Sequence, residues 1–453
     1  MKGAKMCILA VDIGTSSVKM VILDESYNIL DSISIKYNYK ISNIDWVELD
    51  PDEVFLAMIK GLKIMSKYRD KIQVIGFDTF SPSVSFMDKD GEMLYPIITH
   101  LDRRSKKQTK KIMEVMGKDS FQNITGVQPF TGGVSITTIL WMMENRPDIL
   151  DRTYKVGHLN TYIYHKLTGV WASDPTNASM MGLYETIKWG NWSEEICETF
   201  GIPMDKLPPI MPAGSIAGTL TKEISELTGL YEGIPVALGT NDAASTQVAV
   251  SNTNAGDILI ISGSSEMISI ISDKPIVNDN YYLRNAITPG KWQIFAITIG
   301  GFAIDWFRKE FYKDMDINTF FNVELPDVIQ NYIDNTTVTF LPYLAGDRQS
   351  LEPKRGAFNG LSLDTTRKDM LAGILLGMHE PILETLNISS KFLNLNKNIK
   401  LTGGMINDQF MEVKGKLLND YNFTVKHNCT AIGSGMLAYE SLKAITFDSN
   451  VSI

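Results

Sequence analysis

Hydrophobic and polar residues alternate in a pattern that appears twice along the chain. Each copy begins with an apolar strand, continues through a turn of glycine and hydroxyl residues, and ends in a second strand. Laying Gly14-Thr15-Ser16 over Gly263-Ser264-Ser265 brings strand over strand on both sides. Single hairpins of this kind are common, but the repeat indicates an ancient duplication. The predicted strands of the two copies are Met6–Val11, Val18–Leu23, Asp257–Ile261 and Met267–Ile271.

Between the two hairpins, much of the sequence has apolar residues at the spacing of amphipathic helices. A further strand is expected over Ile29–Ile35, which alternates isoleucine with polar residues, and another over Asn398–Leu401. Helices are predicted over Pro51–Met65, Ser105–Met116, Thr137–Asn145 and Asp151–Leu167.

The length of the chain predicts more than one domain. A chain of 453 residues, of which 44% are hydrophobic, can bury a large core but exceeds what one core usually supports. A boundary fits near Ser251–Asn254, just before the second hairpin. We therefore expect two domains, residues 1–250 and residues 251–453.

Composition excludes several classes of protein. The longest apolar runs are too short to cross a bilayer, and the N-terminal residues lead into a strand without the apolar stretch of a secretory signal. The 3 cysteines are too few for a disulfide framework or a zinc cluster, so a reducing, cytoplasmic setting is expected. The net charge of -9 argues against a nucleic-acid partner.

The turn after the first strand carries the first candidate chemistry. Gly14 would let backbone N–H groups approach a phosphate, while Thr15 and Ser16 add hydroxyl donors. Asp12 could hold a magnesium ion directly or through water. The alternative is an aspartate and hydroxyl residues that satisfy only their own hairpin turn. The second copy of the turn would supply matching donors from the other half of the chain.

Two later segments add candidate groups. Asp242 follows a glycine turn at the end of an apolar strand and opens a helix of small residues, so it is either a catalytic base or a helix N-cap. Gly403 and Gly404 follow the strand that ends at Leu401. Paired glycines would let a purine or ribose lie against the backbone, although an ordinary turn has the same sequence.

Taken in order, these segments resemble the FGGY family of carbohydrate kinases, relatives of xylulokinase, gluconokinase and glycerol kinase. The resemblance covers nearly the whole chain, and so many matches in order are not expected by chance. The matching segments are Asp12-Ile13-Gly14-Thr15-Ser16, residues 172–179 (ASDPTNAS), Thr240-Asn241-Asp242-Ala243-Ala244, Gly300-Gly301 before Ile304-Asp305-Trp306, residues 340–348 (FLPYLAGDR) and Leu401-Thr402-Gly403-Gly404.

The resemblance implies a fold, a reaction and roles for single residues. The implied fold is α/β, with two actin-like (ribonuclease H-like) ATPase domains around a cleft, the sugar mainly on the first and the nucleotide mainly on the second. The implied reaction is phosphorylation of a hydroxyl of a sugar, sugar acid or polyol, with ATP and Mg²⁺ as cofactors. The implied residues are Asp12 for the metal, Asp242 as catalytic base, Gly14, Thr15, Ser16, Gly263, Ser264, Gly301, Gly403, Gly404 and Asn407 for the nucleotide, and Ser81, Pro82, Asp102, Arg104 and Asp242 for the substrate.

Departures from the family pattern cluster in the sugar-facing half. The family's Trp-x-Asp-x-Arg segment appears as His100-Leu101-Asp102-Arg103-Arg104, without its tryptophan. Phe80-Ser81-Pro82 stands where xylulokinases carry Gln-Met-His, which removes an imidazole from the substrate site. Glu266 stands where glycine is usual, and a carboxylate near phosphates would be repulsive unless it faces away or meets the metal. The kinase class is therefore better defined than the substrate.

Two other classes of function share the expected fold. An actin-like ATPase would hydrolyse ATP with water as acceptor, whereas a sugar sensor without catalysis would be expected to lose Asp12 or Asp242, and both are present. Residues 172–179 and 340–348 favour the sugar kinase. Its partner would be a small sugar or polyol, with neither nucleic acid nor membrane, and the frequent dimers of the family make a homodimer one option.

Overall fold

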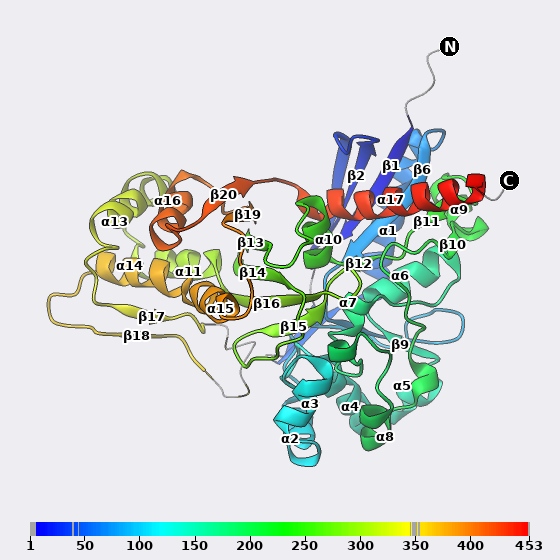
Figure 1. Ribbon diagram of the computed structural model, residues 1–453, viewed down its shortest axis with the longest axis horizontal. Helices are drawn as coiled ribbons and strands as arrows, with labels where there is room; N and C mark the ends of the chain where they lie inside the picture. Colours follow the sequence, from blue (N-terminus) through cyan, green and yellow to red (C-terminus); the bar gives the residue numbers. More distant parts are fainter. Residues whose placement is uncertain are drawn as a thin grey trace, which may run out of the picture. The chain divides into compact units, whose positions relative to one another are not determined.

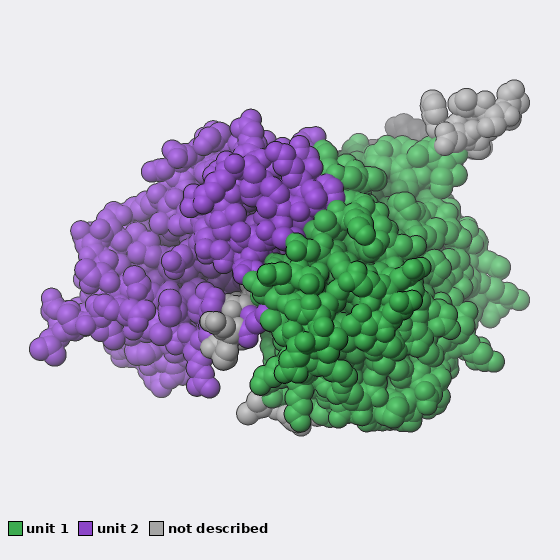
Figure 2. Space-filling model, turned by 60° about the horizontal axis from the view of Figure 1, so that its bottom comes forward, with its two compact units in different colours: residues 1–253, 284–291, 428–453 green, residues 254–283, 292–427 purple. Residues whose placement is uncertain are grey.

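The chain forms two compact units in a computed structural model that describes residues 6–38, 40–43, 45–344, 346, 351 and 354–451 (Figure 2). Unit 1 contains residues 1–253, 284–291 and 428–453, and unit 2 contains residues 254–283 and 292–427. The chain therefore changes unit after residues 253, 283, 291 and 427. The sequence indicated the first of these points, near Ser251–Asn254, but not the return of the last segment to unit 1.

The sheet of unit 1 grows from the first hairpin. β1 pairs antiparallel with β2 and parallel with β6, and β2 pairs antiparallel with β3. The strand order is β10-β11-β6-β1-β2-β3, with β12 also paired to β6. These strands are β1 (Cys7–Ile13), β2 (Ser17–Asp24), β3 (Ile29–Lys36), β6 (Ile72–Thr79), β10 (Gly218–Thr219), β11 (Pro235–Val236) and β12 (Thr240–Asn241). A smaller sheet holds β4 (Lys40–Asn43), β5 (Trp46–Leu49), β8 (Ile97–Thr99), β7 (Ser83–Met87) and β9 (Lys155–Gly157).

Unit 2 has a sheet of the same topology. β13 pairs antiparallel with β14 and parallel with β19, and β14 pairs antiparallel with β16. β13, β14, β16 and β19 thus take the places that β1, β2, β3 and β6 take in unit 1, which is the ribonuclease H-like arrangement expected twice. The strands are β13 (Ile258–Ser262), β14 (Ser265–Ser272), β15 (Tyr282–Asn285), β16 (Trp292–Ile299), β19 (Asn398–Thr402) and β20 (Asn422–Val425), with β17 (Thr339–Leu341) and β18 (Ala357–Asn359) in a separate pair.

Helices cover both faces of the unit 1 sheet. Leu9 and Val11 of β1 lie in the core that includes α1, whereas Ile8 and Ala10 lie in the core that includes α17. This alternation follows from the two-residue period of a strand. The last helix of the chain therefore packs against its first strand (Figure 1). The helices of unit 1 are α1 (Pro51–Met65), α2 (Lys106–Val115), α3 (Lys118–Thr125), α4 (Ser135–Asn145), α5 (Pro147–Arg152), α6 (Leu159–Thr168), α7 (Pro175–Ala178), α8 (Glu194–Phe200), α9 (Lys222–Thr228), α10 (Asp242–Ala249) and α17 (Cys429–Val451).

Two glycines allow α17 to approach its neighbours closely. A Cβ on Gly76 of β6 would lie 2.3 Å from the carbonyl oxygen of Ser434 and 2.8 Å from the Cβ of Ala438. A Cβ on Gly433 would lie 1.8 Å from the carbonyl oxygen of Ser245 in α10. Since real Cβ atoms do not approach a carbonyl oxygen this closely, glycine is needed at both positions. α17 is thereby packed on β6 and on α10 together.

The helices of unit 2 enclose a second hydrophobic core. Phe307 of α11, Val328 of α13 and Leu371 of α14 are fully buried in it, together with Val413 of α16. The helices are α11 (Gly301–Phe311), α12 (Ile317–Thr319), α13 (Leu325–Asn331), α14 (Arg367–Gly377), α15 (Glu380–Ser390) and α16 (Asp408–Leu417). Among the helices of the described residues, none combines the length and apolar composition needed to cross a membrane.

One predicted helix is wrong. The segment Asp151–Leu167 was expected to be a single helix, but α5 ends at Arg152 and α6 begins at Leu159. Between them β9 pairs antiparallel with β7, and its Val156 is buried. The pairing partner lies about seventy residues earlier in the chain, so helical spacing alone could not reveal the break. Ala345, Asp347 and Arg348 of the predicted motif at 340–348 lie outside the described residues.

The tight contact of α17 with β6 predicts that adding one methyl group at Gly76 destabilises the protein. Gly76→Ala should lower the free energy of unfolding by about 1–3 kcal/mol, because neither the strand nor the Ser434 carbonyl can move away freely. Gly415→Ala is the control, since a Cβ there meets no heavy atom within 4 Å. Urea denaturation followed by circular dichroism compares the variants, and equal midpoints for Gly76→Ala and the wild type would contradict the packing described.

Candidate active site

The turn between β1 and β2 is closed by bonds within the protein. The N–H of Gly14 donates to the carbonyl oxygen of Ser17 at 3.0 Å, and the hydroxyl of Tyr37 donates to the carbonyl oxygen of Gly14. A Cβ on Gly14 would meet only the Ser17 oxygen, at 3.5 Å. Packing within the protein therefore does not require glycine here. The glycine leaves this face of the turn open beside the Thr15 and Ser16 hydroxyls, as the approach of a phosphate would need.

The carboxyl ends of three neighbouring strands bring three aspartates together in unit 1. Asp12 of β1 stands opposite Asp78 of β6 in the parallel register, and Asp78 stands opposite Thr240 of β12. Asp242 follows two residues after Thr240, at the start of α10. Asp12 and Asp242 were predicted from the sequence. Asp78 was not, because it lies within an apolar strand where nothing local indicates a site.

Burial raises the pKa of all three carboxyl groups, and repulsion from a neighbouring aspartate adds to it for Asp12 and Asp78. Burial and then the charge of Asp242 raise the pKa of Asp12 to about 6, while Lys19 opposes this shift. Burial, followed by the charges of Asp12 and Asp242, holds the pKa of Asp78 well above its usual range. Burial also raises the pKa of Asp242, against an N–H bond from Ala243 and the positive charge of Arg284. Crowded carboxyl groups of this kind are typical of functional sites.

Asp242 is not the N-cap of its helix. Asn241 occupies that position, where its side-chain oxygen accepts from the N–H of Ala244 at 2.9 Å. Asp242 is the first residue of α10, and its Oδ1 accepts from the N–H of Ala243 at 2.7 Å. The alternative that Asp242 serves only as a cap is therefore wrong. The asparagine immediately before it in the sequence was the available signal.

Ser81 and Pro82 follow β6 at the same edge of the sheet. The N–H of Phe80 donates to the carbonyl oxygen of Ile13 at 3.0 Å, which holds this segment beside the end of β1. The half-buried Ser81 has its hydroxyl 3.2 Å from Nδ1 of His158, which precedes α6. Burial lowers the pKa of His158 to about 4, so its ring is neutral at physiological pH. His158 was not singled out from the sequence.

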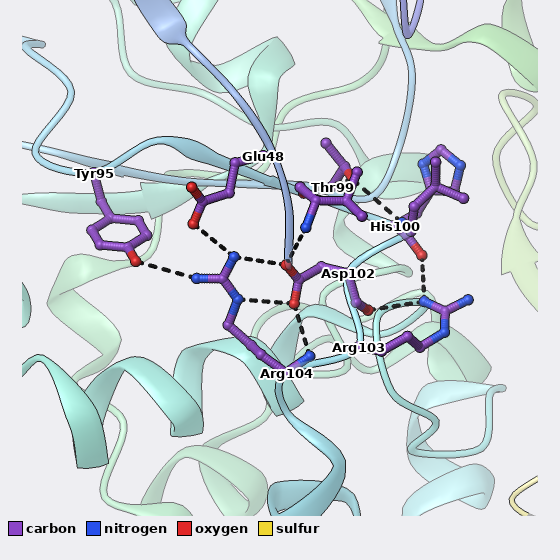
Figure 3. A network of polar contacts seen from close by, with 9 residues as sticks. Glu48, Tyr95, Thr99, His100, Asp102, Arg103 and Arg104 are labelled. Atoms are coloured by element: carbon purple, nitrogen blue, oxygen red, sulfur yellow. Dashed lines mark hydrogen bonds and ion pairs between the residues drawn. The ribbon is translucent and has the colours of Figure 1, made fainter. Parts of the chain in front are cut away.

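Asp102 and Arg104 form a buried ion pair (Figure 3). Arg104 donates to Asp102 through Nε at 2.9 Å and through Nη2 at 2.7 Å, and Nη2 also donates to Glu48 at 2.6 Å. The guanidinium lies 4.1 Å from the ring centre of Trp46 and 5.0 Å from that of Trp141. Only 1% of each side chain is exposed in this pair, so its contacts are with the protein itself. A contact with substrate stays a prediction for both residues.

The predicted nucleotide residues of unit 2 converge on the turn between β13 and β14. The N–H of Gly301 donates to the carbonyl oxygen of Gly263 at 2.9 Å, and that of Gly300 donates to Ser264 at 3.0 Å. Gly403 has a φ of +122°, and a Cβ on it would lie 2.0 Å from the carbonyl oxygen of Ser262. Glycine is therefore required where the end of β19 passes the turn.

Gly404 and Asn407 continue this segment into α16. A Cβ on Gly404 would meet no heavy atom within 4 Å, so its surface is open. Asn407 is the N-cap of α16, and its Oδ1 accepts from the N–H of Phe410 at 3.0 Å. Glycine faces without a side chain beside a helix N-terminus suit an anionic or planar ligand. The structure thus brings Gly301 and Gly403 against the turn that contains Gly263 and Ser264, and Gly404 and Asn407 follow Gly403 along the chain.

Glu266 faces the interior of unit 2. It is buried and accepts from the ammonium group of Lys414 in α16 and from the hydroxyl of Ser262 at 2.9 Å. Lys414 also lies 3.0 Å from Nε2 of His379, whose Nδ1 donates to the carbonyl oxygen of Leu375. Burial and the charge of Lys414 lower the pKa of His379 to about 3, so the ring accepts from the lysine. The carboxylate of Glu266, beside the turn between β13 and β14, is thereby neutralised by a lysine 148 positions later.

Comparison with known proteins assigns the chain to a family. Residues 7–249 match the N-terminal domain of the FGGY family of carbohydrate kinases. The chain belongs to this family. It is 26% identical to a xylulose kinase of Staphylococcus xylosus over 95% of this chain and 90% of that protein, and 28% identical to a gluconokinase of Bacillus licheniformis over 88% and 80%.

A solved structure supports the fold of this FGGY kinase. The glycerol kinase of Plasmodium falciparum with ADP superposes with a TM-score of 0.83 at 24% identity, covering 97% of this chain and 90% of that one. Together with the repeated topology of the two sheets, this shows the two-domain, actin-like ATPase fold that the sequence resemblance implied. The protein is accordingly an enzyme, a phosphotransferase of the carbohydrate kinase class.

The carboxyl groups of unit 1 fit a magnesium ion held together with a nucleotide. Within the described ranges, no three His, Cys, Asp or Glu side chains form a ready-made metal cage. Mg²⁺ usually takes only one or two carboxylates and completes its shell with water and substrate phosphates. Asp12, beside two other aspartates, offers such a partial site, and a divalent cation would offset the burial and the charge of Asp242 that raise its pKa.

The crowding of carboxyl groups predicts that the free energy of unfolding falls as the pH rises. Asp78→Asn should remove part of this pH dependence. Because burial and the charges of Asp12 and Asp242 hold the pKa of Asp78 well above its usual range, the folded state binds more protons than the unfolded state, and this contribution to stability falls as the pH rises above the usual range of a carboxyl group. The variant should gain roughly 1–3 kcal/mol over the wild type between pH 4 and pH 7 without divalent cations.

Urea denaturation in a chelator at several pH values measures this gain. Asp90→Asn is the control, because Asp90 is exposed in the turn after β7 and should follow the wild-type curve. A constant difference between Asp78→Asn and the wild type across the pH range would contradict the electrostatic origin.

Proposed function

We propose that this kinase transfers the terminal phosphoryl group of ATP to a hydroxyl of a sugar, sugar acid or polyol, with Asp242 as the general base. The observation that carries the proposal is the position of Asp242 next to Asp12 and Asp78, at the carboxyl ends of three neighbouring strands. Ligands of open α/β sheets bind at this edge. The family membership and the open glycine turn at Gly14 support the same reaction.

Asp242 is suited to receive the proton of the acceptor hydroxyl. Burial raises its pKa, which makes the carboxylate a stronger proton acceptor than a solvated aspartate, while the Ala243 N–H and Arg284 keep it able to ionise. The bond from the Ala243 N–H also fixes the direction of the carboxylate. No covalent intermediate is required, since phosphoryl transfer depends mainly on positioning and on neutralising charge.

The turn of each unit, taken by itself, is proposed to offer an open glycine face and hydroxyl donors to a nucleotide phosphate. Thr15 and Ser16 offer hydroxyl donors beside the open face of Gly14 in unit 1, and Ser264 offers one beside Gly263 in unit 2, whereas the N–H groups of Gly14 and Gly263 already donate within their own turns. The ADP in the glycerol kinase structure supports a nucleotide on this fold. When bound, Mg²⁺ would neutralise phosphate charge, and Asp12 is the residue proposed to hold it. Gly301, Gly403, Gly404 and Asn407 are proposed to meet the remaining parts of the nucleotide.

The acceptor is proposed to bind beside Asp242 in unit 1. Ser81 and Pro82 lie at the end of β6 and are proposed to contact it directly. Asp102 and Arg104 are buried in their own ion pair, and their proposed contribution is to hold the segment after β8 in place. The names of the two relatives, a xylulose kinase and a gluconokinase, support a sugar or a sugar acid as acceptor.

Asp242→Asn should abolish sugar phosphorylation without unfolding the protein. Asn keeps the size and the bond to the Ala243 N–H, and the helix cap at Asn241 is untouched, so the melting temperature and the affinity for ATP should stay near those of the wild type. Loss of the base should lower kcat by roughly 10²–10⁴-fold. ADP release measured against ketoses, sugar acids and polyols gives the rates.

Asp408→Asn is the matched control for this experiment. Asp408 is exposed and follows the N-cap Asn407 at the start of α16, as Asp242 follows Asn241 at the start of α10. It should retain full activity. Turnover by the wild type that does not respond to any acceptor would instead indicate an ATPase, and normal phosphorylation by Asp242→Asn would refute the proposed base.

Asp12→Ala tests the metal site separately. Turnover should fall severely and the remaining activity should depend less on Mg²⁺ concentration, because a ligand of the ion is lost. The fold should persist, since removing one of three crowded carboxyl groups relieves repulsion. Magnesium titrations of activity, paired with thermal melts, make the comparison. An unchanged magnesium response in a folded variant is the result that would count against Asp12 as the metal ligand.

A further inference from the structure

A chain of polar contacts connects the strand before Asp242 to Ser81. Thr240 of β12 donates to Oδ2 of Asp174 at 3.0 Å, and Oδ1 of Asp174 accepts from the side-chain N–H of Asn177 at 2.7 Å. The side-chain oxygen of Asn177 lies 3.4 Å from Nδ1 of His158. The same Nδ1 lies 3.2 Å from the hydroxyl of Ser81. All five side chains belong to unit 1, and four of them are buried.

This series of polar contacts determines which nitrogen of His158 carries the proton. A carboxylate oxygen only accepts, so Asp174 turns the N–H₂ group of Asn177 toward itself and the amide oxygen toward His158. An amide oxygen also only accepts, so Nδ1 of the ring must be the protonated nitrogen. Since the ring is buried and neutral, Nε2 is then an acceptor, and the hydroxyl of Ser135, 2.7 Å away, donates to it.

The tautomer of His158 in turn fixes the role of Ser81. The single Nδ1–H lies within reach of both the Asn177 amide oxygen and the Ser81 oxygen, and because a protonated Nδ1 has no lone pair to offer, the hydroxyl proton of Ser81 cannot be directed back at the ring. Within the described residues Ser81 makes no other side-chain hydrogen bond, and its side chain is half-buried at the edge where Asp242 lies. Its proton is available to a ligand bound at that edge.

We propose that His158 is a positioning residue that makes Ser81 a hydrogen-bond donor to a sugar oxygen carrying no proton, that is, a carbonyl or carboxylate oxygen. The proposal rests on the proposed function, because it places the acceptor beside Asp242. A carbonyl or carboxylate oxygen offers only lone pairs and matches this donor. A polyol hydroxyl can accept from Ser81 through a lone pair, but its own proton then needs a further acceptor in the site, which a carbonyl or carboxylate oxygen does not require.

The geometry predicts a preference among acceptors of equal chain length. A ketose and the corresponding sugar acid should each be phosphorylated with a higher kcat/KM than the alditol. Ser81→Ala should raise the KM for the preferred acceptor roughly tenfold, while kcat and the KM for ATP stay near wild-type values. The kcat/KM for the preferred acceptor should then approach the kcat/KM for the alditol. Comparing the ketose with the sugar acid shows whether the site prefers a carbonyl oxygen or a carboxylate oxygen.

Variants of His158 separate positioning from a purely structural role. His158→Leu should raise the KM for the acceptor in the same direction as Ser81→Ala, and combining the two should add nothing, because His158 acts through Ser81. His158→Asn places an amide N–H near the position of Nδ1 and should restore part of the acceptor affinity. Should His158→Leu fail to fold, Ser81→Ala and His158→Asn still test the proposal.

Three results would overturn the inference. Additive effects in the double variant, or equal losses for alditol and ketose in Ser81→Ala, would show that Ser81 does not select a proton-free oxygen. A rise in the KM for ATP in His158→Leu would assign His158 a structural role. Failure of the wild type to phosphorylate any of the three classes of acceptor would instead refute the proposed function, and this inference with it.

Discussion

The parallel pairing of β1 with β6 and of β6 with β12 is the constraint on which the site depends. Parallel neighbours end at the same edge, so the register that places Asp12 beside Asp78 also brings the start of α10 to that edge. The consequence is a concentration of negative charge that burial makes costly, as the raised pKa of Asp12 shows. Carboxyl groups crowded together at such an energetic cost are typical of functional sites.

Local features of the sequence were sufficient for the hairpins and for most helices. The turns at Gly14 and Gly263 are formed by hydrogen bonds between neighbouring residues, and apolar spacing reflects the face that each helix buries. Asp78 and the ion pair of Glu266 with Lys414 could not be predicted in this way, because each depends on pairing between segments far apart in the chain. The break at β9 has the same cause.

Each unit also buries a basic side chain between carboxylates and other polar groups. Arg104 lies between Asp102 and Glu48 in unit 1, and Lys414 lies between Glu266 and His379 in unit 2. Buried ion pairs add little net stability compared with apolar packing, but breaking one leaves an uncompensated charge. Their effect is to define position: the first ties the segment after β8 to β5, and the second ties the turn-bearing strand β14 to α16.

The return of α17 to unit 1 has a consequence for synthesis on the ribosome. Residues 6–253 contain every strand of the central sheet of unit 1, yet one face of β1 and β6 is covered by a helix that begins only at Cys429. Domains generally fold as they emerge, N-terminal first. Here the first domain to be translated keeps an apolar face uncovered until the second has been completed. The nascent chain exposes this apolar surface until α17 has been synthesised.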